Sequence, residues 1–301
     1  MISFRYHVLT IVAVFLALAV GVALGGGPLS EVGRSGDSDE QVQDQSAEIE
    51  QASLVTSFQD EFAGDVSQSA LNGVLKHRTV AFVTLPGSDP KIVQSLGDLV
   101  KQADGTIAGT YGAKSALLDP DNSALVSSLS AQIVESVPGT GVATTDPAYV
   151  RLGRLVGFTV GTRQDAGDTG NAATKNVLSS LERSEFLTRN TGNGKRASLV
   201  IIVLGDEGDA SGDLAKLVAQ LATGMAGSAD GLVVAGTTES GASGLLKGIR
   251  TDDDFTAEAS STDSIQTLTG RVATVLTLAA SASGKPGQYG ANGSGGALPR
   301  G

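Results

Sequence analysis

The first part of the chain contains one long apolar run that separates a basic end from an acidic one. No charged residue occurs in residues 8–27 (VLTIVAVFLALAVGVALGGG), which is about the length that a helix needs to cross a hydrocarbon core. Arg5 precedes the run and acidic residues dominate beyond it, so the positive-inside rule predicts a single-pass transmembrane helix with a cytoplasmic N-terminus and an extracytoplasmic bulk. The alternative is a cleaved signal peptide ending near Ala17-Leu18-Ala19, although this run is longer than a usual signal sequence.

Small residues recur every fourth position within this apolar run, at Ala13, Ala17, Gly21 and Gly25. Residues at this spacing share one face of a helix, and small side chains there let two membrane helices approach closely. The stripe therefore predicts helix pairing in the membrane. The competing interpretation is that glycine and alanine are frequent throughout the chain.

A polar helical segment follows the apolar run. Ser38 and Gln41 have the spacing of a capping box, and the helix is expected to continue to about residue 75. Its apolar stripe consists of four residues spaced by three, four and four, namely Val55, Phe58, Phe62 and Val66. Sustained heptads are absent, so a coiled coil is only weakly specified. The stripe predicts either a self-paired stalk, which we favour and which gives a homodimer, or packing on the chain's own body.

After residue 78, apolar β-rich runs alternate with amphipathic segments. Strands are expected at residues 79–85, 106–110, 198–204 and 231–235. Helices are expected between and after these strands, at residues 89–100, 119–134, 148–156, 171–187, 213–221 and 242–250. Asp263 is expected to cap a last helix that ends near residue 280. This alternation predicts an α/β body with a doubly wound, mostly parallel sheet.

The pattern divides the chain into four parts. Residues 1–29 form the cytoplasmic N-terminus and anchor, and residues 30–77 a linker and the helical stalk. Residues 78–283 form the extracytoplasmic α/β domain. Residues 284–301 are rich in glycine and serine, with too few apolar side chains to offset the entropy of ordering, so this tail is expected to be disordered.

Charge and cysteine content narrow the possible partners. The 301 residues carry a formal net charge of −11, and an acidic surface repels nucleic-acid backbones, so we expect no nucleic-acid partner. There is no cysteine, which excludes disulfides, thiol catalysis and zinc sites of the CxxC type.

Ligands in doubly wound folds bind at the carboxyl ends of the strands, where three loops qualify: residues 86–89, 205–212 and 236–241. The second loop, GDEGDASG, carries the hard oxygen donors Asp206, Glu207 and Asp209, which could hold Mg²⁺ or Ca²⁺. The other interpretation, which we favour, is that these acidic residues only stabilise the start of the following helix.

Recognisable catalytic motifs are missing from the sequence. No strand is followed by GxGxxG, and the only histidines are His7, beside the apolar run, and His77, at the end of the stalk. We therefore expect a non-enzymatic protein without a cofactor. Copper prefers thiolate, thioether and imidazole ligands, and the chain offers no cysteine, two methionines and two histidines. Direct copper binding by side chains is not predicted.

Three segments of the sequence nevertheless resemble those of the actinobacterial MctB family. They are MISFRYHVLTIVAVFLALAVGVALGGGPLS, VAFVTLPGSDP and SSTDSIQTLTGRVATVLTLAASASGKPGQYG, and with the order of elements the resemblance spans nearly the whole chain. It implies a cell-envelope protein with a copper-transport function; some members of the family are linked instead to cell separation, acting with a membrane partner to control peptidoglycan hydrolysis. The family supplies no agreed catalytic or metal residues, and this stalk is poorer in Arg, Glu and Leu than is usual in it.

Two functions are therefore open. The resemblance implies copper efflux or homeostasis at the envelope membrane. The residues themselves favour a non-enzymatic scaffold, in which an anchored stalk presents the α/β body to an envelope protein.

Overall fold

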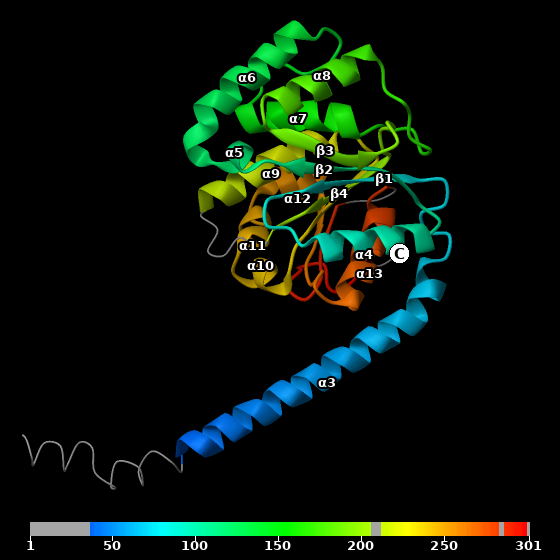
Figure 1. Cartoon of the computed structure of the whole chain (residues 1–301), viewed down its shortest axis with the longest axis vertical. Helices are drawn as coiled ribbons and strands as arrows, with labels where there is room; N and C mark the ends of the chain where they lie inside the picture. Colours follow the sequence, from blue (N-terminus) through cyan, green and yellow to red (C-terminus); the bar gives the residue numbers. More distant parts are fainter. Residues whose placement is uncertain (1–36, 206–211, 283–285, 300–301) are drawn as a thin grey trace, which may run out of the picture. The chain divides into compact units, whose positions relative to one another are not determined.

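The computed structural model describes residues 37–205, 212–282 and 286–299 (Figure 1). Contacts divide the chain into two units, one that ends at Phe58 and one that begins at Gln59. Helix α3, Asp37–Leu71, begins in the first unit and ends in the second. The unit that contains the sheet therefore begins earlier than residue 78, where the sequence pattern placed its boundary.

A seven-stranded sheet forms the centre of the second unit, in the order β3-β2-β1-β4-β5-β6-β7. The strands are β1 Thr79–Thr84, β2 Thr106–Ala113, β3 Leu187–Gly192, β4 Leu199–Val203, β5 Gly231–Ala235, β6 Ser260–Thr262 and β7 Gln288–Tyr289. Neighbouring strands are parallel, except that β3 is antiparallel to β2. This mixed α/β fold with a mostly parallel sheet confirms the predicted class.

Helices cover both faces of the sheet (Figure 1). Helices α4 Pro90–Gln102 and α13 Leu268–Ser281 pack on one face. The other face carries the remaining helices, α5 Ser115–Leu118, α6 Ser123–Ser136, α7 Ala148–Val160, α8 Ala172–Arg183, α9 Gly212–Ala226, α10 Thr238–Ala242, α11 Leu245–Ile249 and α12 Asp253–Glu258, with the short 3₁₀ helix η1 Pro120–Asn122.

Successive side chains of the central strands point into different cores. In β1, Val80 and Phe82 pack with α4 and α13, whereas Ala81 and Val83 face the core built around α7 and α9. Strand β4 repeats this alternation, and all five of its residues are buried. A strand that is covered on both faces reads as a continuous apolar run, which explains why β1, β4 and β5 were predictable.

The last turns of α3 pack on the sheet unit. Leu71 is fully buried with Leu96 of α4, and the carboxylate of Asp60 accepts a 2.9 Å hydrogen bond from the N–H of Leu268 at the start of α13. The apolar stripe of the predicted stalk stays exposed in the single chain, with exposed fractions of 55% for Val55, 68% for Phe58, 58% for Phe62 and 40% for Val66. The helix therefore combines an end fixed to the body with an exposed apolar stripe.

The C-terminal segment is ordered over residues 286–299, so the expectation of a disordered tail from residue 284 is wrong for these residues. Strand β7 pairs in parallel with β6, through Ser261 with Gln288 and Thr262 with Tyr289. The segment has few apolar side chains, as its composition indicated, and it is held by polar contacts that composition does not reveal.

No helix among residues 37–205, 212–282 and 286–299 is long and apolar enough to cross a membrane. The predicted anchor, including Ala13, Ala17, Gly21 and Gly25, lies outside the described residues, and it stays a prediction from the sequence.

Candidate functional site

Strands β1, β4 and β5 are neighbours in the sheet, so the loops that follow them meet at one edge. The chain proceeds outward from β1 through β2 to β3, and then from β4 through β5 and β6 to β7 on the other side. The direction of winding therefore reverses between β1 and β4. This reversal is where open α/β sheets usually bind ligands.

The base of this reversal point is closed by backbone. Gly205, two residues after the end of β4, lies so close to the carbonyl oxygen of Pro86 that a Cβ atom at position 205 would overlap it. The N–H of Leu85 also donates a 2.9 Å hydrogen bond to the carbonyl of Val203. Glycine at position 205 is therefore required for the two loops to lie together, which leaves no crevice between their first residues.

The acidic loop that we considered for a hard cation lies outside the described residues, including Asp206, Glu207 and Asp209. Asp213, in the first turn of α9, is exposed. Within the part of the chain that the structure describes, no group of three or more His, Cys, Asp or Glu could hold a metal ion.

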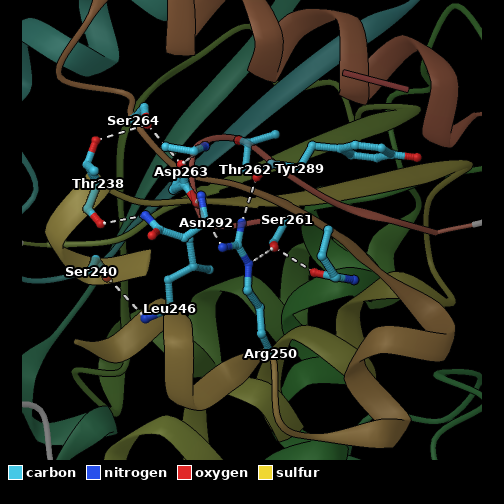
Figure 2. A network of polar contacts seen from close by, with 12 residues as sticks. Thr238, Ser240, Leu246, Arg250, Ser261, Thr262, Asp263, Ser264, Tyr289 and Asn292 are labelled. Atoms are coloured by element: carbon cyan, nitrogen blue, oxygen red, sulfur yellow. Dashed lines mark hydrogen bonds and ion pairs between the residues drawn. The ribbon is translucent and has the colours of Figure 1, made fainter. Parts of the chain in front are cut away.

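The loops after β5 and β6 instead converge on a buried carboxylate, Asp263 (Figure 2). Its Oδ1 accepts hydrogen bonds from the hydroxyl of Ser264 at 2.8 Å and the N–H of Ala291 at 2.6 Å. Its Oδ2 accepts from the guanidinium of Arg250 and from the N–H of Asn292, both at 2.9 Å. Each carboxylate oxygen thus accepts two hydrogen bonds, which is as many as it can accept.

Arg250, at the end of α11, spreads its guanidinium across three partners (Figure 2). Besides the ion pair with Asp263, its Nε donates to the hydroxyl of Ser261 at 2.7 Å, and its Nη2 to the carbonyl of Tyr289 at 2.7 Å. The side chains of Arg250 and Asp263 are 9% and 0% exposed. A buried pair of this kind is tolerable because further hydrogen bonds satisfy both charges.

Glycines allow the surrounding loops to approach this carboxylate. A Cβ atom at Gly241 in α10 or at Gly290 after β7 would collide with the side chain of Asp263. Gly290 also has a φ of +110°, which other residues rarely adopt. The glycine-rich character of the tail is therefore part of what lets it pack.

Outer polar contacts connect the same segments. The hydroxyl of Ser261 donates to the amide oxygen of Gln288 at 2.6 Å, which joins β6 to β7. The amide of Asn292 donates to the carbonyl of Thr238 at 3.2 Å, which joins the C-terminal segment to α10. The arrangement fastens residues 286–299 to the sheet and exposes no reactive group.

The expectation that Asp263 caps the last helix is therefore wrong. Helix α13 starts at Leu268, and the hydroxyl of Thr267 caps it by accepting from the N–H of Gly270 at 3.0 Å. Local sequence rules favour aspartate as a cap, but besides its neighbour Ser264 the partners of Asp263 lie 13 and 28 or 29 positions away. A pairing of distant residues leaves no local signal in a single sequence.

Replacing Asp263 by Asn should unfold the C-terminal segment. The amide keeps one acceptor oxygen, so its NH2 group leaves the N–H of either Ala291 or Asn292 without an acceptor, and Arg250 keeps a buried charge without its counterion. We expect a loss of about 3–5 kcal/mol in the free energy of unfolding, together with lost hydrogen-exchange protection in residues 286–299. Asp254→Asn, at an exposed position in α12, is the matched control and should change neither. Retained protection in D263N would contradict the structural assignment.

A second ion pair lies near β3, between Asp168 and Arg196. It is bidentate, with Nε to Oδ1 at 2.7 Å and Nη2 to Oδ2 at 2.6 Å. Burial tends to raise the pKa of Asp168, but hydrogen bonds from Arg196, Thr162 and the N–H of Gly170 outweigh it and lower the pKa from 3.8 to about 2. The carboxylate is thus held in its charged form, and it fixes the loop before α8.

The stability that Asp168 confers should depend on pH. A carboxyl whose pKa is lower in the folded state stabilises the fold fully above its unfolded pKa, and this contribution is lost as the pH falls from 3.8 to about 2. Asp168→Asn should cost about 2 kcal/mol at neutral pH, and the difference from wild type should shrink in acid. Urea unfolding at a series of pH values measures it, with the exposed Asp121→Asn as control. A difference that stays constant with pH would contradict this explanation.

Two hollows lie away from the sheet edge formed by the carboxyl ends of the strands, where ligand binding was predicted. One, of about 310 Å³, is lined by residues at the starts of β5 and β6, including Asp230, Gly231 and Ser260. The other, of about 410 Å³, lies between α7 and α9 and is lined by Arg154, Phe158 and other residues.

The fold and this site define the class of protein: an α/β protein with a mostly parallel sheet, whose C-terminal segment is held against the sheet by a buried ion pair. Sequence comparison assigns it to a family. The chain belongs to the family described as "Copper transport outer membrane protein, MctB", whose model matches residues 1–299. This confirms the resemblance seen in the sequence.

Curated relatives match along almost their whole length. The chain is 28% identical to the "Copper transporter MctB" of Mycobacterium leprae, over 96% of both chains. It is 25% identical to proteins of the same name from Mycobacterium bovis and Mycobacterium tuberculosis, over 92% of both chains in each case. These names support a copper-related role in the family.

Proposed function

We propose that this chain contributes to copper homeostasis at the cell envelope, as a single-pass membrane protein whose α/β unit lies outside the cytoplasm. The observation that supports the copper role is the full-length family match, together with relatives named as copper transporters. The apolar run at residues 8–27 and the charge difference across it support the anchoring and orientation.

The side chains favour an indirect part in copper handling. Of the two methionines, Met225 is buried in α9, and of the two histidines, His77 lies in a turn after α3 with a φ of 67°. Neither belongs to a group of soft ligands such as copper prefers. A single transmembrane helix also cannot enclose a pore. We therefore propose that the protein acts by binding other protein chains.

A second copy of the chain is one such partner. The stripe of Ala13, Ala17, Gly21 and Gly25 suits close packing of two membrane helices. Val55 and Val66 lie on the same helix α3 and are 55% and 40% exposed. A parallel pair would bury both stripes, so we propose a homodimer through anchor and stalk.

The second candidate function is a non-enzymatic envelope scaffold that binds a partner in cell separation. Two observations favour it: the scarcity of soft copper ligands, and the full hydrogen-bonding of Asp263, which leaves that carboxylate a structural group. Both candidate functions require binding to another protein. They differ in the phenotype expected when the chain is missing: reduced copper tolerance in one case and failed cell separation in the other.

Deleting the encoding gene from the source organism should separate the candidates. For the copper role we expect poorer growth in raised copper and more cell-associated copper, both restored by the full chain, while growth in raised zinc stays normal. The triple variant Asp206→Asn, Glu207→Asn and Asp209→Asn should restore tolerance as well as wild type, because hard oxygen donors suit copper poorly.

Unchanged copper tolerance with chains of unseparated cells would reject the copper role and support the scaffold. Failure of the triple variant, at normal protein levels, would instead make the acidic loop a functional metal site.

The pairing is tested by a cysteine at Val55, because the native chain has none. Val55→Cys should form oxidative crosslinks in membranes, and adding Gly21→Ile and Gly25→Ile should reduce them. Ser57→Cys, two positions away and exposed on another face of α3, is the control and should crosslink much less. Equal crosslinking at both positions would indicate random collision and reject the paired stalk.

A further inference from the structure

A third hollow, of about 260 Å³, lies between helix α8 and strand β3. Helix α8 and strand β3 contact each other, and β3 is the strand at one end of the sheet. Its lining is rich in cationic and hydroxyl groups, which is unusual in a chain with a formal net charge of −11. Its volume is near the lower end of ligand pockets, about 300 Å³, so it suits a compact ligand.

Three cations line this pocket without an ion-pair partner among the described residues: Lys175 of α8, Arg189 of β3 and Lys195 in the loop before β4. All three are exposed. A fourth, Arg196, is already neutralised by Asp168 at 2.6 Å. Glu182 is the carboxylate in the lining, so the pocket keeps an excess of two positive charges.

Tyr111 supplies a hydroxyl group to the same lining. It comes from β2 and is 3% exposed, and its hydroxyl has no hydrogen-bond partner among the described residues. Burial raises the pKa of Tyr111, although the nearby Arg189 opposes the shift. The hydroxyl is therefore protonated at neutral pH and available as a donor. A ligand acceptor in the pocket would replace water as the hydrogen-bond partner of this hydroxyl.

We propose that this pocket binds a phosphate monoester or free phosphate. A dianion balances the excess of two positive charges, and arginine and lysine are the side chains that recognise phosphate oxygens. In the proposed complex the hydroxyl of Tyr111 donates to one oxygen, and the lining hydroxyl of Ser179 is available as a second neutral donor. The acidic remainder of the chain still disfavours nucleic acid, because a strand would place further phosphates against like charge.

The experiment uses the purified full-length chain in detergent and phosphate-free buffer. Isothermal titration with inorganic phosphate and with glycerol 3-phosphate should show saturable binding, and acetate should bind far more weakly. Tighter binding of inorganic phosphate indicates a site for the free ion, whereas tighter binding of glycerol 3-phosphate indicates a phosphorylated metabolite. Affinity for glycerol 3-phosphate should rise from pH 5 to pH 7, because the second pKa of a phosphate monoester is about 6.

Each of two variants removes one polar group from the pocket while keeping a side chain of similar size. Tyr111→Phe keeps the ring and removes the donor, and Arg189→Gln removes an exposed charge; each should weaken phosphate binding about tenfold. The control Lys216→Gln makes a similar charge change at an exposed position of α9, outside the pocket lining, and should change affinity less than about twofold. Unchanged circular dichroism would show that the variants fold.

Lysine acetylation followed by mass spectrometry provides a second measurement. Phosphate should protect Lys175 and Lys195 but not Lys216. The proposal is overturned if wild type shows no saturable phosphate binding, or if Lys216→Gln weakens it as much as Arg189→Gln. These readouts do not involve copper, so they can fail or succeed independently of the proposed function.

Discussion

The buried ion pair between Arg250 and Asp263 holds the two C-terminal strands, β6 and β7, at one edge of the sheet. Strand β7 has two residues and β6 has three, too few for backbone pairing alone to hold an edge. The carboxylate attaches the loop after β7 through two backbone N–H groups, and the guanidinium attaches β6 and β7 from the other side. Burying such a pair costs desolvation, and the surrounding donors and acceptors offset that cost only while the segment stays in place.

The strands of the sheet are apolar at its centre and polar toward its edges, so the sequence predicts the central strands better than the outer ones. Strands β1, β4 and β5 are apolar because helices cover both of their faces, and their runs predicted the fold class correctly. Strand β6 reads Ser-Ser-Thr and β3 reads LTRNTG, and neither contains an apolar period. Hydrogen bonds to residues far along the chain hold these strands. A single sequence carries no signal for such partners.

The same distinction applies to the candidate site. The order of the apolar strands predicted that the loops after β1, β4 and β5 would share an edge, and the structure confirms this. The sequence could not show that Gly205 lies against the carbonyl of Pro86, because that approach depends on the register between β1 and β4. Nor could it show the pocket beside β3, because Tyr111 and Arg189 become neighbours only when the polar strand β3 pairs with β2.

Cations are scarce in this chain, with 21 lysines and arginines against 32 acidic residues, and several arginines are committed to holding segments together. Arg196 and Arg250 each bind a carboxylate, and Arg151 is buried with bonds to the carbonyls of the loop before α7. Lysines and arginines that hold nothing in place would be expected to spread over the acidic surface, where their attraction to it is greatest. Lys175, Arg189 and Lys195 instead gather around one hollow that Tyr111 also lines. Their mutual repulsion is unfavourable until an anion lies among them, so the pocket is better explained by an anionic ligand than by folding alone.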